Sequence, residues 1–238
     1  MSNITSEHVE IKVDDGTTML AWYARPAGQA AKRGILVFPE IFGVNEHIRD
    51  VTNRYAAAGF AALSPELFHR TAPPKWECGY TDFPPAMAHM QAVQEPSLES
   101  DVKATYAWLK TNSPSGGNIA CVGFCMGGRT SFLANSAVPL KAAVSYYGGN
   151  MPSLLHRTSK LSAPMLLLWG ELDQHIPAEH RNQVTTAMRE AGKEYVNVLF
   201  SNADHGFFCD ARQSYEPSAA RLSWDTVQSF LNARLAVS

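Results

Sequence analysis

The sequence predicts an α/β fold with a mostly parallel central sheet, helices on both faces of that sheet and an antiparallel N-terminal hairpin. From residue 33 onwards, short apolar runs alternate with stretches of helical periodicity, the order that builds a parallel sheet covered by helices. Residues 7–13 alternate polar and apolar side chains, and residues 17–24 form a second strand-like run across a turn signal, as in a hairpin. The 238 residues contain no repeat or linker, which favours one domain over residues 1–238.

Each expected element has its own signal in the chain. The strands after the hairpin are short, unbroken apolar runs, typical of buried parallel strands. They cover residues 33–38, 60–63, 118–122, 142–147, 164–169 and 196–200. Asn45 can cap the first helix and Gly59 can end it, while Leu98, Val102 and Tyr106 recur at helical spacing in the second. The expected helices cover residues 46–58, 98–110, 129–135, 178–191 and 217–235.

Residues 64–96 interrupt this alternation. Prolines recur throughout the segment and exclude long regular elements. The segment is also rich in apolar side chains such as Phe83, Met87 and Met90. A long apolar excursion from a regular scaffold is a common form for a loop that covers a substrate. The alternative is an ordinary surface excursion packed by its own aromatic side chains, and the sequence favours neither.

Composition excludes several classes of partner. The net charge of −2 gives no basic surface for nucleic acid or an anionic membrane. The first residues contain no apolar signal core, and no stretch approaches the roughly 18 apolar residues of a membrane span. The four cysteines form no C-x-x-C pair, so we expect a reducing, cytoplasmic location, and the histidines show no metal-ligand spacing, so we expect no metal site and no cofactor.

The motif Gly123-Phe124-Cys125-Met126-Gly127-Gly128 lies between an apolar run and a helix-like stretch. Strand, tight glycine-flanked turn and helix are the context of a nucleophile elbow, in which the nucleophile occupies a strained turn. The N-terminus of the following helix favours the thiolate form of Cys125. The alternative interpretation is a buried structural cysteine after a central strand.

An acid and a base for this thiol are expected on loops beyond the carboxyl ends of later strands. Asp173 and His205 occupy two such loops, and the order Cys125, Asp173, His205 is the nucleophile–acid–base order of the α/β-hydrolase fold. Glu171 and Asp204 compete for the acid role, and His175 competes for the base role. The expected oxyanion donors are the backbone N–H groups of Met126, directly after the nucleophile, and Ile41, in the loop after the strand at 33–38.

Together these motifs resemble the dienelactone hydrolase (carboxymethylenebutenolidase) family of α/β-hydrolases over nearly the whole chain. The resemblance rests on five motifs in order, which lie at residues 39–45, 123–128, 146–148, 170–177 and 205. It implies that Glu40 contacts the resting thiol of Cys125 until substrate displaces it, and a carboxylate there raises the pKa of a thiol by like-charge repulsion. The alternative role of Glu40 is an acid that complements a helix N-terminus.

The chain departs from the family at the substrate carboxylate. Family members that act on dienelactones hold that carboxylate with two arginines, one of them four residues after the catalytic histidine, where this chain has Cys209. The other lies in the covering segment, and no arginine occurs here between Arg70 and Arg129. Arg212, Lys75 and Arg70 are possible substitutes that the sequence does not place. We therefore expect weak or absent activity on dienelactone itself.

The resulting expectation is a cysteine-dependent hydrolase of a small ester or lactone that works through an acyl-enzyme on Cys125. The alternatives are a thioesterase or promiscuous carboxylesterase with the same triad and, from a different class, a non-catalytic binding protein on a hydrolase scaffold. We expect a monomer or weak homodimer. The side chains expected to contact substrate are Tyr146, Phe42, Trp76 and Phe207.

Overall fold

One eight-stranded sheet forms the centre of the molecule. The computed structural model describes residues 3–235. The strand order is β1-β2-β4-β3-β5-β6-β7-β8, and every pairing from β4 to β8 is parallel, while β1 and β2 pair antiparallel with each other and β2 pairs antiparallel with β4. The strands are β1 (Ile4–Lys12), β2 (Thr18–Pro26), β3 (Arg33–Phe38), β4 (Phe60–Pro65), β5 (Ile119–Phe124), β6 (Ala143–Tyr146), β7 (Met165–Gly170) and β8 (Tyr195–Phe200).

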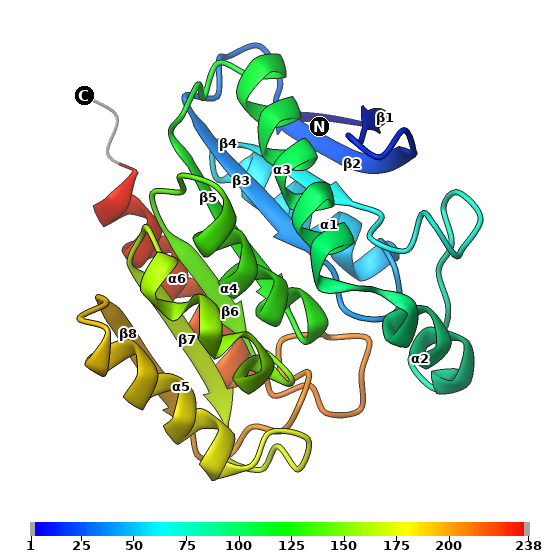
Figure 1. The fold of residues 1–238 in the computed structure, drawn as a ribbon. Coiled ribbons are helices and arrows are strands. Elements are labelled where there is room, and N and C mark those ends of the chain that lie inside the picture. The colour runs from blue at the N-terminus through cyan, green and yellow to red at the C-terminus, as the bar shows by residue number, and fades with distance from the viewer. Residues whose placement is uncertain (1–2, 236–238) are drawn as a thin grey trace.

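Helices cover both faces of this sheet, as Figure 1 shows, with α3, α4 and α5 in front of the strands and α1 and α6 behind them. The α-helices are α1 (Glu46–Ala57), α2 (Phe83–Ala92), α3 (Glu95–Asn112), α4 (Met126–Ala137), α5 (Ala178–Glu190) and α6 (Pro217–Arg234), and η1 (Met151–Lys160) is a 3₁₀ helix. The strands β3 to β7 are almost wholly buried between the two layers, in agreement with their unbroken apolar sequences. The expected fold class is confirmed.

Local signals in the sequence act as expected at several element ends. The hairpin register pairs Lys12 with Thr18 at the turn, and the Asn45 side chain caps α1 by accepting a hydrogen bond from the Ile48 N–H at 3.1 Å. The Gly59 backbone, at φ +94°, turns the chain out of α1 into β4. These ends fix where α1 begins and ends after the loop that follows β3.

Two helices differ from expectation. The segment 64–96 contains the ten-residue helix α2, although its prolines were expected to exclude long regular elements. Pro84 and Pro85 lie in the first turn of α2. The backbone N–H groups of a first turn have no acceptor within the helix, so prolines at these positions remove no helical hydrogen bond. The 3₁₀ helix η1 was also not expected, and it packs beside α4 and α5.

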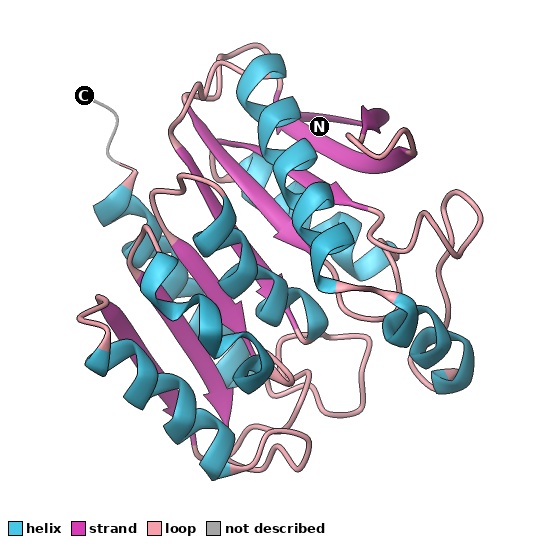
Figure 2. Cartoon of the chain, in the orientation of Figure 1, coloured by secondary structure: helices cyan, strands magenta, loops and turns pink. Residues whose placement is uncertain are grey.

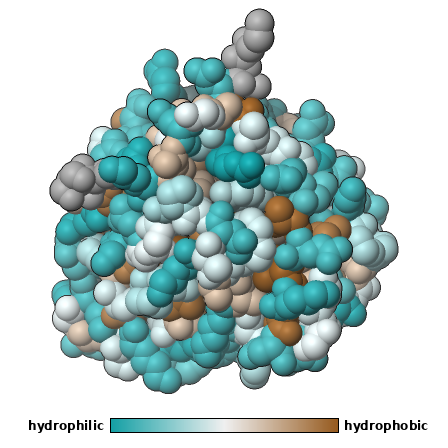
Figure 3. All heavy atoms as spheres, turned by 90° about the horizontal axis from the view of Figure 1, so that it is seen from above, coloured by the Kyte–Doolittle hydropathy of each residue, from teal (hydrophilic) through white to brown (hydrophobic). Residues whose placement is uncertain are grey.

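The loops that follow the parallel strands gather at one end of the sheet, beyond the arrowheads in Figure 2. Because parallel strands all end at the same edge, residues far apart in the chain meet there. No helix among residues 3–235 has the length and apolar character needed to cross a bilayer. Seen from above in Figure 3, the surface is mainly hydrophilic, with a small group of apolar side chains on the right of the view.

Candidate active site

Cys125 occupies a strained turn between β5 and α4. Its backbone lies at φ 54° and ψ −115°, a conformation that a non-glycine residue adopts at a cost of about 1–3 kcal/mol. The turn places Cys125 as the N-cap of α4, where the helix dipole favours an anion. The side chain is partly exposed, whereas both neighbouring residues are buried. The expected nucleophile elbow is thus present in the backbone geometry.

Glycines flank the elbow because the chain packs on itself there. A Cβ on Gly123 would lie 1.9 Å from the carbonyl oxygen of Gly127, and a Cβ on Gly127 would lie 2.1 Å from the carbonyl oxygen of Phe38. These contacts are to backbone atoms, which cannot rotate aside as a side chain can. The glycines therefore allow β5, α4 and the end of β3 to approach closely enough to bring Cys125 and the loop after β3 together.

Asp173 is oriented by the loop that follows β7. Its Oδ1 accepts backbone hydrogen bonds from His175 at 2.8 Å and Ile176 at 3.1 Å, which leaves Oδ2 to accept from His205. The two competing acids have other partners: Glu171 pairs with Arg181, and the Asp204 carboxylate accepts the N–H of His205. Asp173 is therefore the carboxylate that faces the histidine ring.

His205 lies between Asp173 and Cys125. Its Nδ1 is 2.8 Å from Asp173 Oδ2, and this pair is almost completely buried. Burial lowers the pKa of the ring, but the charge and hydrogen-bond interactions with Cys125 and Asp173 outweigh burial and raise the pKa of His205 to about 10. A ring with a raised pKa between a carboxylate and a thiol can take a proton from that thiol, as an activated cysteine nucleophile requires. His175 lies on the rim, with its ring centroid 5.2 Å from that of His205.

Two backbone N–H groups beside Cys125 are available for an oxyanion. Met126 and Ile41 both line the cavity that contains Cys125 and His205. Within residues 3–235, neither N–H donates a hydrogen bond to the protein. Buried backbone donors are rarely left without an acceptor, so this pair is suited to an oxygen that arrives with the substrate.

Glu40 lies behind the site and pairs with a guanidinium. It is 1% exposed, and its Oε1 accepts a hydrogen bond from Arg212 at 3.0 Å. Its Oε2 is buried without a partner, and no hydrogen bond joins it to Cys125 within the described residues. The observed partner of Glu40 is therefore Arg212, whereas the family resemblance implied the thiol of Cys125. It also lies before α1 and outside its first turn, whose acid is Glu46.

Arg212 reaches Glu40 across the loop that carries His205. Gly206 follows His205 with φ +81°, and a Cβ at that position would lie 2.6 Å from the Arg212 guanidinium. The guanidinium also lies 5.7 Å from the ring centroids of both Phe42 and Tyr80. Gly206 thus provides the space through which Arg212 enters the site.

The cavity above Cys125 has a volume of about 350 Å³. Its apolar wall comes from Phe42 and from three side chains of the segment 83–90, namely Phe83, Met87 and Met90. Two cations also line it, Arg212 and Arg129. Within residues 3–235, the Arg129 guanidinium makes no hydrogen bond or ion pair, because the carboxylate of Glu95 near it is engaged by Arg157. A cavity of this size and character fits a small, partly apolar, anionic molecule.

Comparison with known proteins decides the family. The family model described as "Dienelactone hydrolase family" matches residues 19–235. The chain belongs to the dienelactone hydrolase family. A protein of Synechocystis named "Putative carboxymethylenebutenolidase" is 32% identical over 94% of this chain and 96% of its own length. A protein of the same name in Salmonella typhimurium is 34% identical over 88% of this chain and 80% of its own length.

Solved structures agree with this assignment. A structure described as a "Putative Dienelactone Hydrolase from Klebsiella pneumoniae" superposes with a TM-score of 0.87, at 30% identity and with 99% of each chain covered. The protein is therefore an ester or lactone hydrolase of the dienelactone hydrolase family with the α/β-hydrolase fold. The superposed region includes the sheet, the elbow and the loops that carry the candidate triad.

Three of the four side chains expected to contact substrate lie elsewhere. Tyr146 and Phe207 are 0% exposed and pack in the aromatic core below the elbow. Trp76 packs against Phe68 and His89 at the base of the covering segment. Phe42 alone of the four lines the cavity. Tyr146 ends β6 and Phe207 lies two residues after His205, but both side chains point into the core, whereas Trp76 is half-buried outside this cavity.

Of the three substitutes considered for the missing family arginines, Arg212 alone reaches the cavity. Arg70 instead forms a bidentate pair with the buried Asp101, and Lys75 is not among the lining side chains. Arg129 also reaches the cavity, because its place in the first turn of α4, four residues after Cys125, sets it beside the elbow. Residues i and i+4 on a helix share a face, and this spacing could have identified it.

Proposed function

We propose that the protein hydrolyses its ester or lactone through a covalent acyl-enzyme on Cys125. The observation that carries the proposal is the chain of contacts from Asp173 through His205 to a thiol on a strained elbow. His205 takes the proton of the Cys125 thiol as the sulfur attacks the substrate carbonyl carbon, and the imidazolium so formed gives that proton to the leaving oxygen. A water molecule then loses a proton to His205 and attacks the acyl carbon, which releases the acid and restores the thiol.

The Met126 and Ile41 N–H groups are proposed to stabilise the negative oxygen formed in both steps. Both donors lie beside Cys125 in the cavity wall and have no protein acceptor among the described residues. Fixed donors aimed at a developing oxyanion contribute about 3–4 kcal/mol each in hydrolases. Asp173 holds the ring of His205 with Nδ1 protonated, which directs the other ring nitrogen to the thiol.

Glu40 is proposed to moderate the reactivity of the thiol through Arg212. A bare carboxylate near Cys125 would disfavour the thiolate, but the guanidinium of Arg212 offsets that charge at 3.0 Å. Burial lowers the pKa of Arg212, and the charges of Glu40, Tyr147 and Cys125 together raise it above its ordinary value. Arg212 thus keeps its proton between two acidic groups, and the effect of Glu40 on the thiol depends on this ion pair.

Arg129 supports a preference for anionic substrates. A half-buried guanidinium without a protein acceptor is best satisfied by an anion that enters with the ligand. The expectation of weak dienelactone activity assumed that no arginine reached the substrate carboxylate. With Arg129 in the cavity wall, we now propose that anionic esters are cleaved faster than neutral esters of the same acyl length.

The acyl-enzyme is tested by rapid quenching with p-nitrophenyl acetate followed by mass spectrometry of the intact chain and of its peptides. We expect one acetyl group on the peptide that contains Cys125 and none in the Cys125→Ala variant. Acetyl that persists in this variant, or turnover that survives iodoacetamide alkylation of Cys125, would contradict the mechanism and favour a binding protein on a hydrolase scaffold. Acyl-thioesters run in parallel distinguish the thioesterase alternative.

The role of Arg129 is tested by comparing p-nitrophenyl acetate with mono-p-nitrophenyl succinate. Loss of a charge-assisted hydrogen bond costs about 2–3 kcal/mol, so Arg129→Gln should lower kcat/KM for the succinate roughly 30- to 150-fold. The acetate should change by no more than roughly threefold. Arg221→Gln, at an exposed arginine outside this cavity, is the matched control. Equal losses on both substrates would show that Arg129 does not recognise the anion.

A monomer or weak homodimer in a reducing compartment remains our proposal for the state of the protein. The four cysteines, Cys78, Cys121, Cys125 and Cys209, are all free thiols. A catalytic thiol retains its activity only where it is kept from sulfenic and sulfinic oxidation. Size-exclusion chromatography with light scattering measures the oligomeric state directly.

A further inference from the structure

We propose that His47, Cys209 and Asp210 form a binding site for a divalent metal ion of the zinc class, beside the catalytic cavity and separate from it. His47 lies in the first turn of α1, and Cys209 and Asp210 lie in the loop between β8 and α6. The sequence predicted no metal site because spacing along the chain reveals only ligands that are close in sequence. The fold brings these three residues together from positions 162 residues apart.

The distances fit a metal that is bound by three side chains. One ligand atom from each residue lies within 4.8 Å of the other two, and this is the one such group found within residues 3–235. His47 Nδ1 and Asp210 Oδ1 are 3.3 Å apart. Two ligands on a tetrahedral zinc ion, with bonds of about 2.0–2.1 Å, lie roughly 3.3 Å from each other. The first two ligands are thus already at the required spacing.

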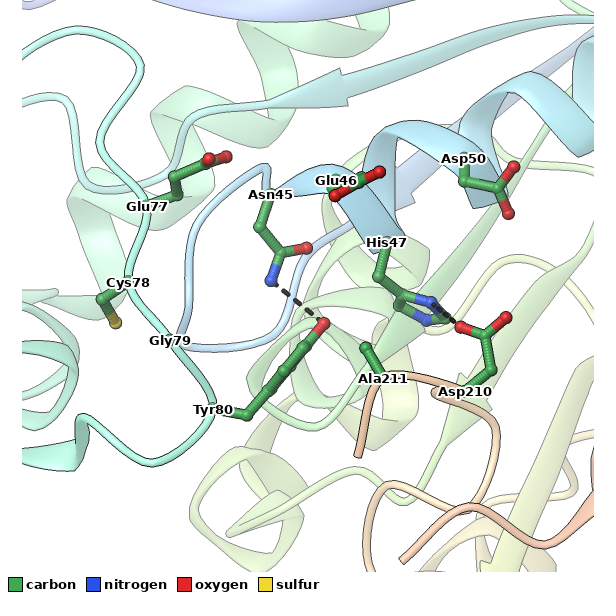
Figure 4. A pocket seen from close by; sticks show the side chains of 10 residues that line it. All are labelled: Asn45, Glu46, His47, Asp50, Glu77, Cys78, Gly79, Tyr80, Asp210 and Ala211. Atoms are coloured by element: carbon green, nitrogen blue, oxygen red, sulfur yellow. Dashed lines mark hydrogen bonds and ion pairs between the residues drawn. The ribbon is translucent and has the colours of Figure 1, made fainter. Parts of the chain in front are cut away.

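His47 is a buried side chain, and one of its two ring nitrogens has no partner within residues 3–235. It is 6% exposed, and while Nδ1 faces Asp210, Nε2 has no hydrogen-bond partner within residues 3–235. Figure 4 shows the ring directed towards Asp210 and Ala211, on the wall of the cavity. Cys209 is fully buried beneath it. An imidazole held in this way loses little freedom when an ion replaces the proton that it shares with Asp210.

The cavity in front of this group is lined by acidic side chains. Its volume is about 690 Å³, and four carboxylates line it, from Glu46, Asp50, Glu77 and Asp210. No lysine or arginine is among the lining residues. Arg49 and Arg54 pair with these acids from outside the cavity wall. These arginines offset the charge of three of the carboxylates, so within residues 3–235 Glu46 is the lining acid without an arginine partner, next to His47.

The donor set selects the kind of metal. A thiolate, an imidazole and a carboxylate together favour borderline ions such as Zn²⁺ and Co²⁺ over Mg²⁺ and Ca²⁺, which require oxygen ligands. Binding displaces the proton of the Cys209 thiol to solvent, and the sulfur becomes a ligand as the thiolate. Three protein ligands leave the fourth tetrahedral position to a water molecule from the open cavity.

The site adjoins the catalytic machinery through the chain itself. Cys209 stands four residues after His205, at the position where the resemblance implied a substrate-binding arginine, and Arg212 follows three residues later. An ion held between α1 and this loop would fix the loop that carries both His205 and Arg212. Metal binding should therefore raise the melting temperature in proportion to the logarithm of free metal above the dissociation constant.

The test uses Co²⁺ as a spectroscopic probe in the full chain with Cys125→Ala, because the catalytic thiol and His205 could also hold a metal. We expect saturable binding of one Co²⁺ per chain, with a thiolate-to-cobalt charge-transfer band in the near ultraviolet. The band should be retained when Cys78→Ser is added, since Cys78 lines the same cavity but lies outside the proposed ligand set. It should disappear when Cys209→Ser is added instead.

Asp210→Asn provides a second variant, because Asp210 is exposed and its substitution leaves the buried core unchanged. It should weaken Co²⁺ binding by at least roughly tenfold, the lower end of what even an outer-shell change costs. Zn²⁺ should displace the Co²⁺ spectrum, whereas a large excess of Mg²⁺ should not. A chain that does not bind Co²⁺, a band that survives Cys209→Ser, or equal affinity in Asp210→Asn would each overturn the proposal.

Discussion

The substitution Asp173→Asn tests the roles assigned to the triad most directly. In the native protein, Asp173 Oδ1 accepts two backbone N–H groups and Oδ2 accepts the Nδ1–H of His205. The asparagine oxygen must remain with the two backbone donors, since its NH₂ group has no acceptor there. The NH₂ group then faces Nδ1 of His205 and forces that nitrogen to accept a hydrogen bond.

The consequence is a change of tautomer with little change of shape. With Nδ1 as an acceptor, the neutral ring carries its proton on Nε2 and cannot take one from the Cys125 thiol. We expect kcat/KM for p-nitrophenyl acetate to fall roughly 10⁴-fold, which corresponds to about 5.5 kcal/mol of transition-state stabilisation. The free energy of unfolding should fall by about 1–3 kcal/mol, since the hydrogen bonds lose their charge assistance.

The assay combines steady-state kinetics, urea unfolding and ¹⁵N NMR of the His205 ring. Glu171→Gln is the matched control, because Glu171 is an exposed carboxylate two residues away that pairs with Arg181. Its activity should stay within roughly twofold of the native value. An Asp173→Asn variant with more than roughly a tenth of native kcat/KM, or one that loses activity with the Nδ1–H tautomer intact, would refute the reasoning.

Three further outcomes follow from the site and the elbow. In Cys125→Ser, the pKa of His205 should fall from about 10 towards its ordinary value, because the thiolate that raises it is gone, and NMR titration of the ring measures this. Because folding raises the pKa of His205, the protonated ring stabilises the fold fully below about pH 6.5, and this stabilisation is lost as the pH rises to about 10. The difference in melting temperature between the native protein and Cys125→Ser should therefore narrow over that range. Gly123→Ala should lower the free energy of unfolding in urea by at least about 3 kcal/mol, because its Cβ meets a backbone oxygen at 1.9 Å. In the control Gly117→Ala the Cβ meets nothing within 4 Å, so the free energy of unfolding should change by less than about 0.5 kcal/mol. Similar losses in both variants would contradict the close-packing argument.

The fold was predictable from the sequence because its signals are local and repeated. Each buried strand is a continuous apolar run, and turn or cap residues such as Asn45 and Gly59 mark where helices begin and end. The order of Cys125, Asp173 and His205 was predictable because parallel strands deliver their loops to the same edge. Position along the chain was therefore enough to indicate that the fold brings these three side chains together.

The substrate cavity was less predictable because it depends on the directions in which side chains point. Tyr146 follows the same strand-end logic as the triad, yet it packs against Phe124 in the core. Arg129 and Arg212 reach the cavity from a helix turn and a loop whose orientations only the folded chain fixes. The helix α2 was missed because its prolines were counted against regular structure without regard to their place in the first turn.

The same helix α2 separates two demands that usually conflict in an enzyme. It has a single buried residue, Ala86, yet its segment supplies Phe83, Met87 and Met90 to the cavity wall. Substitutions at these three positions change the shape and polarity of the space above Cys125 while removing little of the apolar area that stabilises the fold. Selection can therefore adjust the range of accepted esters in this segment at little risk to folding, and randomising it is an economical route to new specificity.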